Sequence, residues 1–156
     1  MPKCIILTGN IGSGKSTLVK EYVKKGYIAI ARDALRYNIG AGKYIFDLKL
    51  EHAIWETELD MLINFLELGV NIIIDEVGMS RLMRQRYFGV IDFWGKNHEV
   101  ISIEMPKLSK KESVDRRMQD PHGTPDRKVW EGVWDKFNAQ YEKPTKKEGF
   151  DKLVKL

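Results

Sequence analysis

The sequence has little of what marks cross-linked, secreted or membrane-spanning proteins. It contains one cysteine, Cys4, and five prolines in 156 residues. A single cysteine excludes a disulfide within the chain, and its place in an apolar run favours an inert, buried thiol. That run covers only residues 4–7, which is too short for the core of a signal peptide. No stretch reaches the roughly 20 apolar residues of a membrane helix. We therefore expect a cytoplasmic protein with no membrane partner.

A strong charge of one sign is also missing. The chain has 26 Lys and Arg residues against 22 Asp and Glu residues, which gives a formal net charge of +4. Because the two signs are interspersed, this balance permits an anionic ligand without requiring one. The length, together with the lack of repeats and linkers, predicts one domain over residues 1–156.

Short apolar runs alternate with longer amphipathic stretches along the chain. We expect strands at residues 4–7, 27–31, 70–74, 100–103 and 150–156, and helices at 15–25, 48–68, 80–94, 109–118 and 127–141. This alternation predicts an α/β fold with three layers: a central, mostly parallel sheet, helices on both faces, and a helical lid. Ligands of such sheets bind beyond the carboxyl ends of the strands.

The segment after the first expected strand matches the phosphate-loop pattern G-x-x-x-x-G-K-[ST]. It reads Gly9, Asn10, Ile11, Gly12, Ser13, Gly14, Lys15, Ser16, Thr17. Glycines let successive backbone N–H groups face an anion, and the following helix adds its positive N-terminal end. Lys15 can reach the β- and γ-phosphates, and the Ser16 hydroxyl can ligate Mg²⁺. The segment therefore predicts binding of ATP with Mg²⁺.

Charged residues follow two other strands. Asp33 could accept the proton of an attacking hydroxyl and Arg36 could hold an anionic acceptor; the alternative is a helix N-cap with its ion-pair partner. Asp75 ends an apolar run in the Walker B manner and predicts a second Mg²⁺ contact. Glu76 either orients an attacking water, as in an ATPase, or supports the site of a kinase.

Arginines supply further candidates for binding phosphate. Arg116 and Arg117 end a helix before a Pro-His-Gly loop, and one of them is expected to close over the γ-phosphate as part of a lid. On an earlier helix, Arg81, Arg84 and Arg86 either grip a polymeric acceptor or form a solvated face. His122, between Pro and Gly, is interpreted as a loop residue.

Together these residues resemble the kinase domain of phage and metazoan polynucleotide 5′-hydroxyl kinases. The resemblance runs from the phosphate loop through Arg32-Asp33-x-x-Arg36 and Asp75 to the tail Pro144-Thr145 through Glu148-Gly149-Phe150. It implies Asp33 as general base, Arg36 as an acceptor-phosphate contact, Ser16 and Asp75 as the Mg²⁺ site, and a lid arginine as transition-state stabiliser. It also implies a bacterial or phage-infected cell as the setting. Asp120 stands where the phage pattern has a second lid arginine.

The sequence therefore predicts an ATP-dependent phosphotransferase, with the 5′ end of a nucleic acid as its favoured acceptor. Two alternatives remain open. One is a kinase of a small-molecule hydroxyl, such as a nucleoside, a metabolite or an antibiotic. The other is a nucleotide-dependent ATPase module in which Glu76 activates water.

Overall fold

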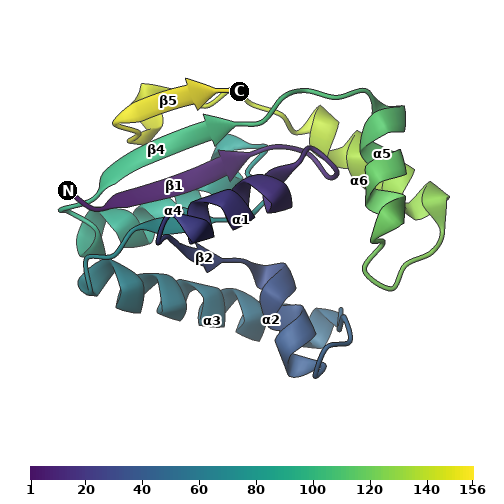
Figure 1. The fold of residues 1–156 in the computed structure, drawn as a ribbon, viewed down its shortest axis with the longest axis horizontal. Coiled ribbons are helices and arrows are strands. Elements are labelled where there is room, and N and C mark those ends of the chain that lie inside the picture. The colour runs from purple at the N-terminus through teal and green to yellow at the C-terminus, as the bar shows by residue number, and fades with distance from the viewer.

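A computed structural model describes residues 1–156 and places a five-stranded sheet at the centre of the molecule (Figure 1). The strands are β1 (Lys3–Thr8), β2 (Ile28–Ile30), β3 (Ile72–Ile74), β4 (Glu99–Glu104) and β5 (Lys152–Lys155), arranged as β2-β3-β1-β4-β5. The helices are α1 (Lys15–Lys24), α2 (Arg32–Ile39), α3 (Leu48–Glu67), α4 (Arg81–Trp94), α5 (Lys110–Gln119) and α6 (Arg127–Ala139), with a 3-10 turn at Lys146–Glu148.

Every pairing between neighbouring strands is parallel, so all five carboxyl ends lie at one edge of the sheet. This confirms the expected α/β fold with a parallel sheet between helices. The short polar helix α2 is the one helix that the apolar pattern did not indicate as an element. It begins after Ala31, so Asp33 lies inside its first turn and is not its N-cap.

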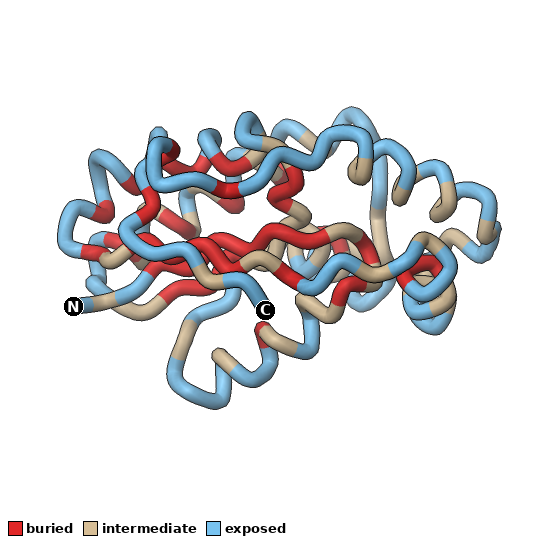
Figure 2. The backbone as a smooth tube through the Cα atoms, turned by 90° about the horizontal axis from the view of Figure 1, so that it is seen from above, coloured by how far each residue is buried: buried red, intermediate tan, exposed pale blue.

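The sheet is buried on both faces because its residues alternate between two apolar clusters. Cys4 and Ile6 of β1 pack with residues of α3 and α4, whereas Ile5 and Leu7 pack with α1. Figure 2 shows the buried residues concentrated along the strands, with exposed residues on the surrounding helices. A rigid sheet of this kind fixes where the loops at its carboxyl edge begin.

Helices α5 and α6 pack against each other beyond the carboxyl edge, and α2 lies near the same end of the molecule (Figure 1). A capping box starts α5: the Ser109 hydroxyl accepts from the Glu112 N–H at 3.2 Å, and the Glu112 carboxylate accepts from the Ser109 N–H at 3.3 Å. None of the helices has both the length and the apolar character needed to cross a bilayer.

The expectation that the α4 arginines are solvated or bind phosphate is wrong for Arg84. Its side chain is fully buried and forms two contacts with the Glu148 carboxylate, from Nε at 2.8 Å and from Nη2 at 3.2 Å. Arg81 and Arg86 are exposed. The arginine therefore anchors the C-terminal tail to the core.

The pattern of the C-terminal tail, residues 144–150, is explained by local contacts. The Thr145 N–H donates to Glu148 at 2.7 Å, and the 3-10 turn ends at Gly149 with φ of +119°. A Cβ at Gly149 would lie 2.9 Å from the Phe88 ring, and Phe150 packs edge-on against the same ring. The Pro-Thr to Glu-Gly-Phe pattern thus fixes the entry into β5.

Candidate functional site

The loop between β1 and α1 presents unpaired backbone donors at a helix N-terminus. Gly12 and Gly14 have positive φ, at +64° and +96°, a region that glycine adopts without strain. Gly14 is the N-cap of α1 and offers no side-chain cap. The first N–H groups of α1 are therefore open to an external acceptor, which is the geometry that binds phosphate.

Lys15 folds back over this loop. Its Nζ donates to the carbonyl oxygens of Gly9 and Asn10, each at 2.8 Å. Burial lowers the pKa of Lys15 to about 8, although Asp75 partly opposes the shift. The ammonium is held at the mouth of the loop by two uncharged acceptors, which a phosphate could replace as a partner.

Asp33 lies in a network of polar and aromatic side chains. Its Oδ1 accepts from Arg36 Nη1 and from the Tyr44 hydroxyl, both at 2.7 Å. Burial alone would raise the pKa of Asp33, but the bond from Tyr44 and the neighbouring His122 and Arg36 hold it below its ordinary value. Asp33 is therefore a carboxylate with one oxygen occupied and the other, Oδ2, available.

Arg36 is engaged on both sides. Besides the contact with Asp33, its Nε and Nη2 donate to Glu51 of α3, at 3.0 and 2.5 Å. Its side chain is only 11% exposed. A guanidinium whose donors are already used holds Asp33 in place better than it contacts a free acceptor.

Asp75 follows β3, and its backbone N–H donates to the Ile30 carbonyl of β2 at 2.8 Å. Its carboxylate has no hydrogen-bond or ion-pair partner in the protein. Burial raises the pKa of Asp75, an effect that Lys15 opposes and that Glu76 reinforces. A partly buried carboxylate without a partner can hold a cation.

Glu76 is not free. Arg32 donates to its carboxylate from Nε at 3.1 Å, from Nη2 at 2.9 Å and from the backbone N–H at 2.8 Å. Glu58 of α3 lies behind this pair, fully buried, and burial with the adjacent Glu76 raises its pKa to about 9. A carboxylate held by three donors is poorly placed to activate a water molecule.

The two lid arginines differ in environment. Arg117 stacks over Trp130 of α6, with its guanidinium carbon 4.9 Å from the ring centre, and its buried Nε has no partner. Its charge acts on Lys15 and Asp75. Arg116 is exposed, but its Nη1 lies 3.9 Å from where a Cβ on Gly14 would stand. Both arginines therefore come from α5 toward the phosphate loop.

Sequence reasoning missed three residues around Asp33. Tyr37 and Tyr44 lie on or just after α2, and His122 reaches them from the loop between α5 and α6. His122 lies 3.8 Å from Asp33. Its backbone φ of +49° is uncommon for a residue other than glycine and costs on the order of 1–3 kcal/mol. Nothing in the local sequence of His122 indicates its contacts with Tyr37, Tyr44 and Asp33, because these contacts depend on how α5 and α6 pack.

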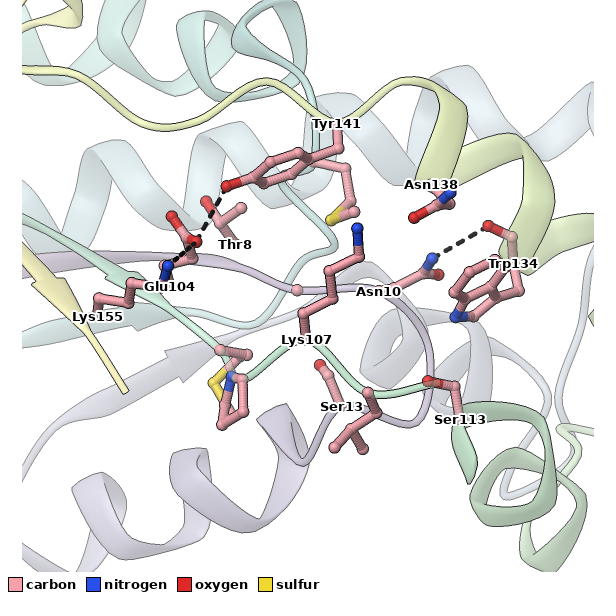
Figure 3. A pocket seen from close by; sticks show the side chains of 15 residues that line it. Thr8, Asn10, Ser13, Glu104, Lys107, Ser113, Trp134, Asn138, Tyr141 and Lys155 are labelled. Atoms are coloured by element: carbon pink, nitrogen blue, oxygen red, sulfur yellow. Dashed lines mark hydrogen bonds and ion pairs between the residues drawn. The ribbon is translucent and has the colours of Figure 1, made fainter. Parts of the chain in front are cut away.

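A cavity of about 250 Å³ lies on the β4 side of the phosphate loop, between the end of β4 and α6 (Figure 3). Trp134, Met105 and other apolar side chains line it, and the buried hydroxyls of Thr8 and Ser13 have no partner there. Asp33, Asp75 and Glu76 are not among its lining residues. The cavity therefore adjoins the phosphate loop but not the candidate catalytic carboxylates.

The protein groups fit a magnesium ion. The Asp75 carboxylate lacks a protein partner, and the Ser16 hydroxyl is exposed in the first turn of α1. The structure contains no group of three or more His, Cys, Asp or Glu side chains arranged to hold a metal. Mg²⁺ commonly takes only one or two protein oxygens and completes its shell with water and substrate phosphates.

Known proteins share this architecture. A family model described as an AAA domain matches residues 4–144. No curated protein sequence matches the chain. Among solved structures, a chain of the Pnkp1/Rnl/Hen1 complex is 24% identical over 74% of this chain, with a TM-score of 0.59. A fungal RNA kinase is 18% identical over the whole chain, with a TM-score of 0.68.

A third similar structure is the Mycobacterium tuberculosis APS kinase CysC in complex with AMPPNP and APS. It is 18% identical over 99% of this chain, with a TM-score of 0.57. The chain spans 38% of the matched Pnkp1/Rnl/Hen1 chain, 76% of the fungal RNA kinase and 88% of CysC. At these identities the likeness shows a common P-loop fold.

Proposed function

The chain belongs to the AAA-domain family of P-loop proteins, and on that basis we propose that it is an ATP-dependent kinase that phosphorylates a hydroxyl group. The observation that carries the proposal is Asp33, an ionised carboxylate at the carboxyl edge whose Oδ1 is held by Arg36 and Tyr44. A carboxylate with one free oxygen suits the removal of a proton from an acceptor hydroxyl.

In this proposal Gly9 to Thr17 cradle the triphosphate and Lys15 moves from the loop carbonyls onto its β- and γ-phosphates. Asp33 acts as general base. Ser16 and Asp75 would hold Mg²⁺, which when bound neutralises charge on the phosphates. Arg117, and Arg116 beside Gly14, would stabilise the transferring group.

The role given to Arg36 changes from the one that the resemblance implies. Because Glu51 and Asp33 occupy its guanidinium, Arg36 supports Asp33 through ion pairing. Contact with an acceptor phosphate would require it to leave Glu51. Two single variants, Glu51→Gln and Arg36→Lys, test this role. Each should lower turnover and leave the KM for ATP unchanged.

A polynucleotide 5′-hydroxyl is the acceptor that we favour. Tyr37, Tyr44 and His122 surround Asp33 with aromatic rings, and Phe46 nearby is 60% exposed, with Arg36 beneath it at 5.4 Å. An exposed ring backed by a guanidinium is a surface on which a base can stack. Two of the similar solved structures are named for RNA, one as the Pnkp1/Rnl/Hen1 RNA repair complex and the other as a fungal RNA kinase, and these names support a polynucleotide acceptor.

A kinase of a small-molecule hydroxyl is the second candidate. The TM-scores are 0.57 for CysC and 0.58 for a gluconokinase from Sinorhizobium meliloti 1021, close to the 0.59 of the Pnkp1/Rnl/Hen1 chain. The ATPase alternative loses support, because Arg32 holds the Glu76 carboxylate that would have to orient water.

The test is an acceptor panel with labelled ATP: 5′-hydroxyl DNA and RNA oligonucleotides, nucleosides, gluconate and other small alcohols. We expect the label to be transferred to the 5′-hydroxyl oligonucleotides. Asp33→Asn should lower turnover about 10²- to 10⁴-fold, the range for loss of a general base, with little change in ATP binding. Phe46→Ala should raise the KM for oligonucleotides only. Label on small molecules alone would favour the second candidate, and near-normal turnover by Asp33→Asn would refute the general base.

A further inference from the structure

His122 joins the lid to the helix that carries Asp33. Its Nδ1 lies 2.6 Å from the Tyr37 hydroxyl, and its ring stacks on Tyr44 at a centroid distance of 4.9 Å and an angle of 15°. Its Nε2 lies 3.8 Å from Asp33 Oδ2, the oxygen that neither Arg36 nor Tyr44 occupies. The His122 side chain is only 14% exposed, whereas the Asp33 side chain is 47% exposed, so the imidazole is enclosed while the carboxylate stays open to solvent.

The groups that face the imidazole come from every neighbouring element. They are Asp33, Arg36 and Tyr37 from α2, Tyr44 from the following segment, Asp120 from its own loop, Arg117 from α5 and Trp130 from α6. Burial and the charge of Arg117 lower the pKa of His122, while Asp33 and Asp120 oppose the shift. The imidazole is therefore mainly neutral at neutral pH.

A neutral imidazole has one donor and one acceptor nitrogen. The pKa of Tyr37 is raised, chiefly by burial, so its phenol keeps a proton to donate. With the Tyr37 hydroxyl donating to Nδ1, the imidazole proton resides on Nε2 and points toward Asp33 Oδ2. The gap of 3.8 Å between them is longer than a direct hydrogen bond.

We propose that His122 is a positioning residue that docks the lid loop on α2 and, with Asp33 Oδ2, brackets the acceptor hydroxyl. This inference rests on the proposed kinase function. The hydroxyl donates its proton to Asp33 Oδ2 and accepts from His122 Nε2–H, which leaves one lone pair of the oxygen free to attack the γ-phosphorus.

The chemical step balances. The acceptor oxygen forms a bond to the γ-phosphorus, the bond between that phosphorus and the β–γ bridging oxygen breaks, and ADP leaves with the electron pair. The hydroxyl proton ends on Asp33 Oδ2. His122 neither gains nor loses a proton; it fixes the direction from which the oxygen attacks.

Docking of His122 also brings the lid arginine into place. Arg117 and His122 come from the same end of the lid, and Trp130 contacts both, with the His122 ring at 6.3 Å and the Arg117 guanidinium at 4.9 Å. When the loop lies on α2, the charge of Arg117 reaches Lys15 and Asp75. The end of α5 and the loop after it therefore carry both the residue beside Asp33 and the arginine that faces the phosphate loop.

Kinetics of three variants test this role. His122→Phe keeps an aromatic ring for Tyr44 but removes both nitrogens, Tyr37→Phe removes only the hydroxyl, and His52→Gln is a control at a side chain that is 84% exposed. We expect His122→Phe to lower kcat about 10²-fold, as misplacement of a reacting group does, with the KM for ATP unchanged. Tyr37→Phe should show a smaller loss in the same direction, and His52→Gln none.

The pH profile separates positioning from simple folding support. Without His122 the pKa of Asp33 should rise, so the acidic limb of kcat/KM for the acceptor should move to higher pH in His122→Phe. Three results for His122→Phe would each overturn the proposal: a normal kcat, an acidic limb of kcat/KM at the same pH as in the wild type, or a change limited to a higher KM for ATP.

A titration that needs no turnover keeps the inference separate from the kinase assignment. NMR of the His122 ring should give a pKa below the ordinary histidine value in the full chain, and a still lower value in Asp33→Asn, which removes the opposing carboxylate. An unchanged His122 pKa in that variant would refute the pairing whatever the acceptor panel shows. If the titration behaves as expected while no acceptor is labelled, the proposed function fails and the His122 contact stands.

Discussion

The guanidinium of Arg32 grips the Glu76 carboxylate, with Nη2 at 2.9 Å from Oε2 and Nε at 3.1 Å from Oε1. The two residues directly precede and follow the candidate catalytic groups in the chain: Arg32 precedes Asp33, and Glu76 follows Asp75. One ion pair therefore ties the end of β2 to the end of β3 and fixes the spacing of the two aspartates.

Glu76→Ala should loosen both strand ends. Loss of a carboxylate that accepts from a charged donor is expected to lower the free energy of unfolding by about 1.5–3 kcal/mol, and misplacement of Asp33 to lower acceptor phosphorylation about 10²-fold. Urea unfolding and turnover measure the two effects, with Glu56→Ala as an exposed control on α3. If Glu76→Gln instead abolished ATP hydrolysis measured without acceptor and spared transfer, Glu76 would be a water-activating base.

Lys15 should make ATP binding depend on pH. Burial lowers its pKa to about 8 in the free protein, and a bound triphosphate favours the charged form, so the pKa is higher in the complex. Binding is then strongest below the free pKa and weakens as pH rises above it, by up to about tenfold per pH unit for one linked proton. Calorimetry with MgATP between pH 7 and 9.5 measures this dependence.

Lys15→Arg is the matched control for that titration. A guanidinium stays charged throughout this range, so the affinity of the variant, although weaker, should not fall with pH. A flat wild-type profile between pH 7.5 and 9.5 would show that the ammonium is not the group that binds the phosphates.

The strands, the phosphate loop and the residues at the strand ends were predictable because each depends on local pattern. Buried parallel strands read as continuous apolar runs, such as residues 72–74, and the glycine spacing of the phosphate loop is a requirement of backbone geometry. The same logic places Asp33 and Asp75 at the carboxyl edge, because parallel strands end together.

The partners of those residues were not predictable, because they come from distant parts of the chain. Glu51 reaches Arg36 from α3, and Glu148 reaches Arg84 from the tail 64 positions away. An arginine on a helix gives no local sign of whether it will be solvated or buried against a carboxylate. His122 is similar: its contact with α2 depends on how α5 and α6 pack.

Glu58 should make the stability of the protein fall as pH rises. Burial, together with Glu76, raises its pKa to about 9, so the folded chain keeps a proton that the unfolded chain loses above the ordinary glutamate pKa. Between those two values the free energy of unfolding should decrease with pH, by up to about 1.4 kcal/mol per unit from this group.

Glu58→Gln tests this directly. The amide keeps an acceptor for the Tyr87 hydroxyl, which donates to Glu58 at 3.1 Å, and a donor for Glu76. The advantage of the variant over the wild type should therefore grow from pH 5.5 to pH 8.5 in urea unfolding. Parallel curves would mean that Glu58 is ionised in the folded protein.

The pair of Arg84 and Glu148 should dominate the stability of the C-terminal tail. Both side chains are almost completely buried, at 0% and 1% exposure, and Arg84 Nη1 also donates to the Gly78 carbonyl at 2.8 Å. Arg84→Met leaves the Glu148 carboxylate buried without its partner, and the loss of one member of such a pair costs about 3–5 kcal/mol. Arg86→Met, on the exposed side of α4, is the control and should cost little.

The double variant Arg84→Met with Glu148→Leu gives the sharper result. Replacing both charges removes the desolvation penalty as well as the attraction, so it should be clearly more stable than Arg84→Met alone, as exchanges of whole buried pairs commonly are. Urea unfolding of the two single variants and the double variant measures the coupling. Additive losses would mean that Glu148 is stabilised in the tail by Thr145 alone, with Arg84 contributing only its packing.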